Sequence, residues 1–185
     1  MKRKDFLRGT CGLAAVFGSV AAGGPGVRAQ ETVAAGAAEK REAALKKQIH
    51  GYLKSLMDNL DGNLAEAERV AVQEANGRAC AARGGSLDLA KSFKGDVDAF
   101  LAEMRKYIGA GNAVREGRTI HLAYEKCFCP LVADLKEPIS PSYCLCTRGW
   151  TKAVYEALTG KPVRVALRAS IKRGDPKCLI EVEIA

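Results

Sequence analysis

Apolar residues recur at intervals of three and four through the first part of the chain, which is the spacing of a buried helix face. A second helix should open at Asn63 and Glu66, whose separation is that of a capping box, and run toward Cys80. Residues 93–108 predict a third helical region, interrupted near Gly95-Asp96. The clearest run lies before both of these segments and predicts the first helix. Its apolar positions are Leu45, Ile49, Tyr52, Leu53, Leu56, Met57 and Leu60.

The period changes to two in the second half of the chain, and such alternation is typical of β-strands. Residues 119–127, 163–168 and 178–184 all alternate. The helix between the first two strands, which carries Trp150, should end at Gly160. This order of elements predicts an α+β fold, in which N-terminal helices pack on a small antiparallel sheet formed mainly by the C-terminal half.

The start of the chain has the layout of a secretory signal, with a basic beginning, a short apolar stretch and small residues before a cut near Gln30. The run Arg3-Lys4-Asp5-Phe6-Leu7-Arg8 resembles the twin-arginine motif R-R-x-F-L-K except at Lys4, and the ordinary secretory route stays open. We therefore expect a twin-arginine-like signal peptide at 1–29, a flexible lead at 30–38 and one cysteine-rich α+β domain at 39–185. The mature protein would be periplasmic or otherwise extracytoplasmic, with no stable membrane span after signal removal.

The positive charge of the chain is concentrated at its start. The whole chain has a formal net charge of +8, but residues 1–29 hold five basic residues and one acidic residue, which leaves 24 basic and 20 acidic residues in the remainder. No basic run with interleaved aromatic residues occurs, so no nucleic-acid partner is expected.

Two C-x-C arms, Cys127-Phe128-Cys129 and Cys144-Leu145-Cys146, dominate the candidate chemistry. In an extended segment residues i and i+2 point to the same side, so each arm would present both thiols to one point. Two arms then supply the four sulfur ligands of a tetrahedral centre. The arms predict a metal site at Cys127, Cys129, Cys144 and Cys146, with zinc as the expected ion and copper(I) or an iron–sulfur cluster as alternatives.

Two other interpretations of the cysteines stay open. Once Cys11 is removed with the signal, six cysteines remain, and an exported chain with six fits three disulfides and no cofactor. Reactive or merely buried thiols are the third interpretation. The resemblance to a twin-arginine signal implies export of a chain already folded in the reducing cytosol, which favours the metal.

The remaining cysteines are candidate additional ligands. Cys178 lies on the apolar face of the last strand and is more simply explained as a core residue. Cys80 follows Gly77, and a glycine within a helical stretch indicates close packing or a site. Cys144 and Cys146 precede a helix, and a helix N-terminus favours thiolate over thiol.

A family resemblance rests on Tyr143-Cys144-Leu145-Cys146, on the helix through Trp150, and above all on the run from Ser170 to Ile180, SIKRGDPKCLI. These segments resemble the C-terminal half of the L-2-amino-thiazoline-4-carboxylic acid hydrolase-like family, and the ending is similar to 4-vinyl-reductase-type small-molecule-binding domains. The run Gly77-Arg78-Ala79-Cys80-Ala81 resembles a G-R-x-C-A element of related bacterial proteins. The resemblance implies an α+β domain with cysteines, Cys80 and Cys178 included, near a ligand or zinc site. The doubled arms and the export signal depart from the hydrolase pattern.

The expected function is non-catalytic binding of a metal ion, or of a small-molecule ligand, by an exported cysteine-cluster domain. The alternative is a cysteine- or metal-dependent hydrolase of a small heterocyclic or amide substrate. A closed four-sulfur site favours binding, whereas three ligands and an open position favour catalysis. No Ser/His/Asp order or carboxylate pair stands out, so no catalytic residue is assigned.

Overall fold

The computed structural model describes residues 25–185, and most of the predicted signal peptide, residues 1–24, lies outside them. The described chain is α+β, as predicted, with its sheet in the C-terminal half. In chain order the elements are α1 (Pro25–Asn63), α2 (Glu66–Arg83), α3 (Ser86–Ser92), α4 (Val97–Ile108), β1 (Ala113–Glu116), β2 (Thr119–Tyr124), the 3-10 turn η1 (Tyr143–Leu145), α5 (Cys146–Thr159), β3 (Arg164–Ala169), the 3-10 turn η2 (Ile171–Arg173) and β4 (Cys178–Glu183).

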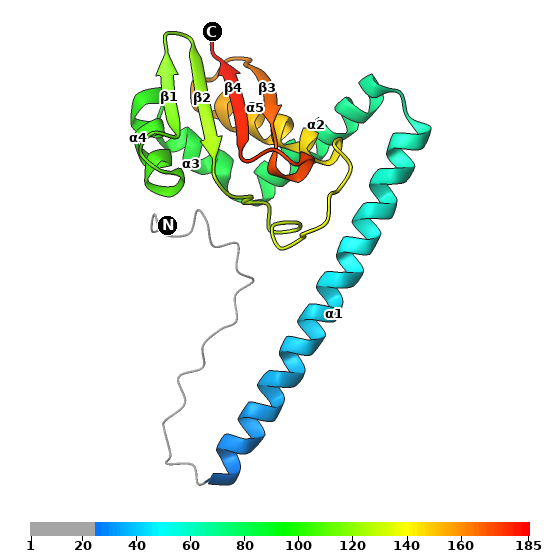
Figure 1. Cartoon of the computed structure of the whole chain (residues 1–185). Coiled ribbons are helices and arrows are strands. Elements are labelled where there is room, and N and C mark those ends of the chain that lie inside the picture. The colour runs from blue at the N-terminus through cyan, green and yellow to red at the C-terminus, as the bar shows by residue number, and fades with distance from the viewer. Residues whose placement is uncertain (1–24) are drawn as a thin grey trace.

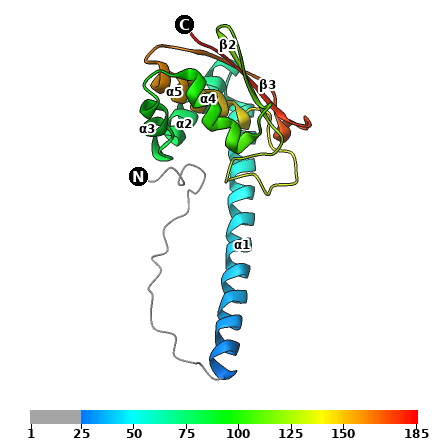
Figure 2. The same ribbon diagram turned by 90° about the vertical axis from the view of Figure 1, so that its left-hand side faces the viewer.

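Helix α1 is far longer than the sequence pattern predicted, and it projects from the rest of the domain as a rod (Figures 1 and 2). Residues 30–38, where we expected a flexible lead, lie inside this helix. The correction has a local cause, because the segment is rich in alanine, which has the highest intrinsic helix propensity. Of the predicted apolar face, Met57 is buried, but Leu45 and Tyr52 are 55% and 67% exposed.

Local capping signals set the ends of the shorter helices. The carboxylate of Asp96 accepts a hydrogen bond of 3.0 Å from the Ala99 N–H and opens α4, which confirms the predicted interruption before this helix. The Glu68 carboxylate accepts the Ala65 N–H at 2.8 Å, so α2 starts two residues later than the Asn63–Glu66 pair suggested. Gly160 ends α5 with φ of 70°, a left-handed conformation that glycine adopts without strain.

The sheet is antiparallel throughout and has the strand order β1-β2-β4-β3. Strand β1 was missed because it has four residues and buries only its first, Ala113. The strand predicted over residues 119–127 ends at Tyr124, so Cys127 lies in the loop that follows β2 and not on the sheet. Helices α4 and α5 cover one face of this sheet (Figure 2).

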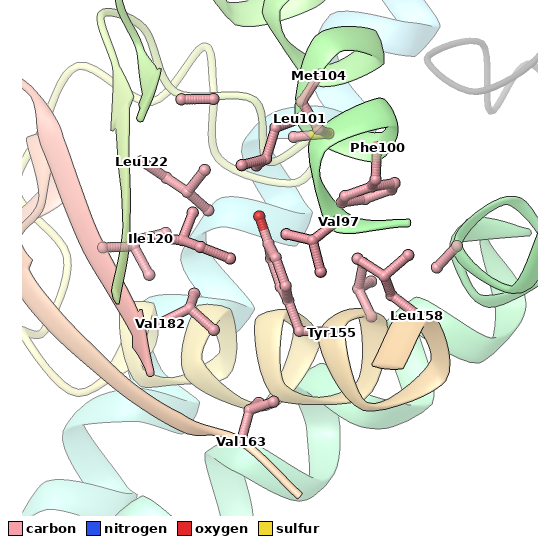
Figure 3. Packing of buried hydrophobic residues seen from close by; sticks show 14 of the residues in the cluster. Val97, Phe100, Leu101, Met104, Ile120, Leu122, Tyr155, Leu158, Val163 and Val182 are labelled. Atoms are coloured by element: carbon pink, nitrogen blue, oxygen red, sulfur yellow. The ribbon is translucent and has the colours of Figure 1, made fainter. Parts of the chain in front are cut away.

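The main core lies between that sheet face and the helices (Figure 3). Tyr155 of α5 projects between the strand residues and α4, and its ring meets Phe100 edge-on at a centroid distance of 5.6 Å. The aromatic pair continues to Phe93 at 5.4 Å. Ile120, Val182 and the other inward strand residues complete the packing.

A second, smaller core lies beneath the loop that joins β2 to η1. Met57, Val132, Ile139 and Tyr143 are its buried members, and Cys127, Cys129 and Cys144 pack against them. Helix α1 enters this cluster through Met57, whose sulfur accepts a hydrogen bond of 2.9 Å from Gln73 of α2. Both thiols of the first arm, and Cys144 of the second, therefore pack against the small core that the end of α1 completes.

Candidate metal centre

The first arm follows β2 closely, in a segment without helix or strand. Tyr124, the last residue of β2, packs edge-on against Phe128 at 5.8 Å, which fixes the middle of the arm against the sheet end. The carbonyl of Cys129 accepts hydrogen bonds from the backbone N–H groups of Val132 and Ala133, at 3.2 Å and 2.8 Å. The arm is thus anchored on both sides, with Cys127 and Cys129 half-buried.

The second arm is helical, which corrects the expectation of an extended segment. Cys144 lies within η1, and Cys146 is the first residue of α5. The helix therefore begins at the second cysteine of the arm and not near Trp150. Residues i and i+2 of a helical turn lie about 200° apart around the axis, so the two thiols of this arm do not face one point.

Cys178 is the first residue of β4 and sits opposite Tyr124 in the β2–β4 register. Its sulfur accepts a hydrogen bond of 3.4 Å from the Ile171 N–H. Cys178 and Cys144 lie within electrostatic reach of each other, so ionisation of one thiol would oppose ionisation of the other. Through η2, the structure brings Cys178 beside the second arm.

Cys80 lies on α2, near the point where α2 crosses α5 at close range, and so at the same end of the domain. A Cβ on Gly77 would lie 1.8 Å from the carbonyl oxygen of Cys146, and a Cβ on Gly149 would lie 1.9 Å from that of Glu74. Only glycine permits this approach, so the unusual helical glycine seen in the sequence marks close packing. Cys80 lies three residues beyond Gly77, on the adjacent turn of α2.

Ion pairs on both sides of the crossing hold the two helices together. Glu74 of α2 pairs with Arg148 at 3.0 Å and with Lys152 at 2.6 Å, both from α5. Arg78 and Glu156 pair at 2.6 Å one turn further along. The positions of Cys80 and Cys146 are therefore fixed by backbone packing and by charge.

The four arm thiols are linked by electrostatic contact in a closed ring. Cys127 interacts with Cys129, Cys129 with Cys146, Cys146 with Cys144, and Cys144 with Cys127. Each pair is close enough for ionisation of one thiol to oppose ionisation of the other. The six cysteines of the described chain are all free thiols.

Burial keeps the thiols of Cys127, Cys144 and Cys146 protonated at neutral pH. It raises the pKa of Cys146 to about 12, and it raises the pKa of Cys127 and of Cys144 as well. At Cys146, burial therefore outweighs the stabilisation of the thiolate that we expected from the N-terminus of α5. Buried protonated thiols are weak nucleophiles.

Two cations, which the sequence pattern did not single out, face the thiols from η2. The buried Lys172 donates hydrogen bonds to the carbonyls of Ala133 and Leu135, at 3.2 Å and 2.5 Å, and its charge acts on Cys127 to favour the thiolate. Arg173, which donates to the Pro141 carbonyl at 3.0 Å, acts in the same direction on Cys144. Both lie in the run Ile171-Lys172-Arg173-Gly174, in which no pattern indicates contact with the arms.

The two histidines contact groups other than the thiols. His50 on α1 contacts the Leu131 carbonyl at 3.0 Å. His121 lies on the sheet between Glu116 at 3.7 Å and Glu181 at 3.9 Å. Over residues 25–185, no group of three or more His, Cys, Asp or Glu side chains is already arranged to hold a metal ion. Metal binding at the cysteines would require the side chains to move closer together.

Comparison with known proteins shows the family of the chain. Residues 16–185 match a family described as being of unknown function, DUF6144, and the protein belongs to it. The match includes every cysteine discussed except Cys11. No curated protein and no solved structure gives a significant match. Within the described part of the chain, no helix has both the length and the apolar character needed to cross a membrane.

The raised pKa of Cys146 makes the stability of the reduced, metal-free protein sensitive to alkali. The thiol ionises near 9.0 in the unfolded chain and near 12 in the folded one, so the unfolded state loses its proton first. The contribution of the buried Cys146 thiol to the free energy of unfolding is fully present below about pH 9, and it is lost as the pH rises through the pKa of the folded state. We expect urea unfolding free energies to fall above pH ~9, with a shallower fall in Cys146→Ser. Equal slopes in the two proteins would contradict burial as the cause.

Proposed function

We propose that this protein is a thiolate metal-binding domain, exported across a membrane, in which Cys127, Cys129, Cys144 and Cys146 bind zinc. The observation that carries the proposal is the convergence of all six described cysteines, from a loop, two helices and a strand, on one end of the domain. Thiols gathered from separate elements can supply the several sulfur ligands that one metal ion needs. Thiolate ligands favour zinc, copper(I) and iron–sulfur clusters.

The surroundings of the thiols suit a bound cation with thiolate ligands. Residues 125–142 contain no helix or strand, so the side chains of the first arm can adjust without breaking a regular element. The second arm is held by the α2–α5 crossing. Lys172 and Arg173 supply positive charge close to the sulfurs, which offsets the net negative charge of a metal bound by several thiolates.

The alternative of a hydrolase, which the family resemblance in the C-terminal half suggested, has less support. A cysteine nucleophile needs a thiolate, and burial holds the pKa of Cys127, Cys144 and Cys146 above the ordinary range. A disulfide framework is the stronger competitor, because an exported chain meets an oxidising compartment.

Elemental analysis of the purified full chain tests the proposal. We expect at least one zinc ion per chain, and loss of the metal in Cys146→Ser. A strong chelator should lower the melting temperature, since metal binding stabilises only the folded state, while a reductant that binds no metal should leave it unchanged.

The opposite response would identify disulfides. Stability that falls on reduction but not on chelation would contradict metal binding, because a disulfide contributes roughly 2–4 kcal/mol through the unfolded chain. A metal-free protein in which the six thiols of residues 25–185 all react under native conditions would also contradict the proposal and favour reactive cysteines. Cys11→Ser is the matched control, since Cys11 lies outside the family match.

A further inference from the structure

Helix α1 carries two apolar stripes, and the rest of the described domain packs against one of them. Leu53, Met57 and Leu60 lie on the small core beneath the loop that joins β2 to η1. The second stripe, which we call the outer stripe, consists of Leu45, Ile49, Tyr52 and Leu56. Tyr52 is 67% exposed, Leu45 55% and Leu56 38%. Large apolar side chains gathered on one exposed helix face indicate a contact surface.

The outer stripe has the spacing of a coiled-coil seam. Its members follow one another at intervals of four, three and four residues, which is the spacing of the a and d positions of a heptad. On the opposite face of the helix, Lys40, Lys47 and Lys54 recur at intervals of seven. A second helix packed on the outer stripe would therefore leave the charged face in water.

A groove lies beside the outer stripe, and the loop after β2 contributes to it. The groove has a volume of about 330 Å³ and is lined by Leu45, Gln48, Ile49, Tyr52, Leu53 and Leu131. The loop is held beside α1, because Lys46 donates a hydrogen bond of 3.2 Å to Asp134 and His50 contacts the Leu131 carbonyl at 3.0 Å. The Leu131 side chain is 51% exposed, so it adds apolar surface next to the stripe.

The N-terminal part of α1 stands away from the domain. The helix has 39 residues and projects as a rod, and residues 37–48 are exposed (Figures 1 and 2). Helices in proteins owe most of their stability to packing of an apolar face, because an isolated helix is marginal in water. A partner on the outer stripe would supply this packing where the domain does not.

We propose that the outer stripe binds the outer stripe of a second copy of this chain, with the two α1 helices antiparallel. When Ile49 lies opposite the partner's Tyr52, Leu45 lies opposite the partner's Leu56. Two-fold symmetry repeats both contacts, so the four residues of each helix form four apolar layers. This pairing is independent of the cysteines and of the metal that they bind.

Charge favours the antiparallel orientation. Glu42 and Asn59 occupy the next seam positions at the two ends of the outer stripe. In an antiparallel pair Glu42 meets the partner's Asn59, whose amide can donate a hydrogen bond to the carboxylate. A parallel pair would set the two Glu42 carboxylates against each other, which costs free energy. Residues 39–47 hold four basic and two acidic residues, and residues 54–61 hold one basic and two acidic, so opposite net charges adjoin in the antiparallel pair.

A membrane surface fits the outer stripe less well than a second copy does. Helices that lie on anionic membranes have a polar face rich in lysine and arginine. Residues 39–61 contain five basic and four acidic residues, a net charge of only +1. The charge of this segment therefore gives little attraction to anionic lipid.

Sedimentation velocity of the purified full chain tests the pairing. We expect a dimer at roughly 100 μM, and Leu45→Glu/Tyr52→Glu should weaken it by roughly 100-fold or more, because the pairing would bury carboxylates without partners. The changed side chains are more than half exposed in the single chain, so the monomer should stay folded by circular dichroism. The matched control is Ala44→Glu/Gly51→Glu, which moves both carboxylates back by one residue, to exposed positions outside the seam, and should remain dimeric.

Amine cross-linking of dimers that mix isotopically light and heavy chains tests the orientation. An antiparallel pair places the two Lys40 residues about 30 Å apart, whereas a parallel pair brings them side by side. A short cross-link between Lys40 of the light chain and Lys40 of the heavy chain would therefore overturn the antiparallel arrangement.

Three results would overturn the pairing itself. The first is a wild-type chain that is monomeric at roughly 100 μM and does not bind vesicles. The second is a dimer that survives Leu45→Glu/Tyr52→Glu, or one that the control substitutions weaken equally. The third is a wild-type monomer that binds vesicles of anionic lipid and loses this binding in Leu45→Glu/Tyr52→Glu, which would assign the outer stripe to a membrane surface.

Discussion

Replacing Gly77 by alanine is expected to destabilise the domain by about 3 kcal/mol or more, or to prevent folding. The new Cβ would lie 1.8 Å from the Cys146 carbonyl oxygen and 2.7 Å from the Trp150 nitrogen, both of which are backbone atoms of α5. Backbone cannot rotate away as a side chain does, so the helices would have to separate. Gly149→Ala should be equally severe, because its Cβ would lie 1.9 Å from the Glu74 carbonyl oxygen. Urea unfolding followed by circular dichroism gives the free energies.

Gly51→Ala is the matched control for this experiment. Gly51 also lies in a helix, α1, but nothing would approach its Cβ within 4 Å. Alanine has the better helix propensity, so this variant should be more stable by about 0.5–1 kcal/mol. Wild-type stability in both Gly77→Ala and Gly149→Ala would contradict the close crossing. That result would also remove the reason for placing Cys80 beside Cys146.

The elements that the sequence predicted well are those whose signals are local. The interruption before α4 follows from the Asp96 cap, and the end of α5 follows from Gly160. The strands β3 and β4 were predicted because burial on one side imposes alternation. These features depend on few neighbours, so a single sequence is enough to find them.

The features that the sequence did not predict depend on contacts between distant segments. The thiols of the second arm diverge because Cys144 and Cys146 belong to the turn that starts α5, whereas the C-x-C spacing alone is compatible with an extended arm. Lys172 is held near the first arm by hydrogen bonds to the carbonyls of Ala133 and Leu135, which lie in a loop far from it in the sequence. The local sequence pattern contains no signal for such contacts between distant segments.

The length of α1 was underestimated for a different reason. The prediction relied on apolar periodicity, and residues 30–38 carry alanine and glycine in place of large apolar side chains. The high helix propensity of alanine extends the helix through these residues, although the apolar periodicity that marks a buried face is absent there. The clustering of Cys80 with the arms was hinted at by Gly77, because an internal helical glycine costs stability unless something packs against it.

Zinc affinity is expected to fall steeply as the pH is lowered from about 8 to about 6.5, by roughly tenfold per pH unit for each thiol proton released. Burial raises the pKa of Cys127, Cys144 and Cys146 above the ordinary 9.0, so these thiols hold their protons throughout this range in the metal-free protein. Every one of them that binds zinc must release its proton. Three ligands would therefore weaken binding by about 1,000-fold per pH unit.

Competition with a chromophoric chelator at several pH values measures this slope, and calorimetry in two buffers of different ionisation enthalpy counts the protons directly. Cys144→Ser should reduce the slope, because one titrating ligand is lost, whereas Cys11→Ser should leave it unchanged. Affinity independent of pH over this range would mean that the ligands are already thiolates or are not cysteines. In the first case the ligand thiols would not be buried and protonated, and in the second the metal would have to be placed elsewhere on the chain.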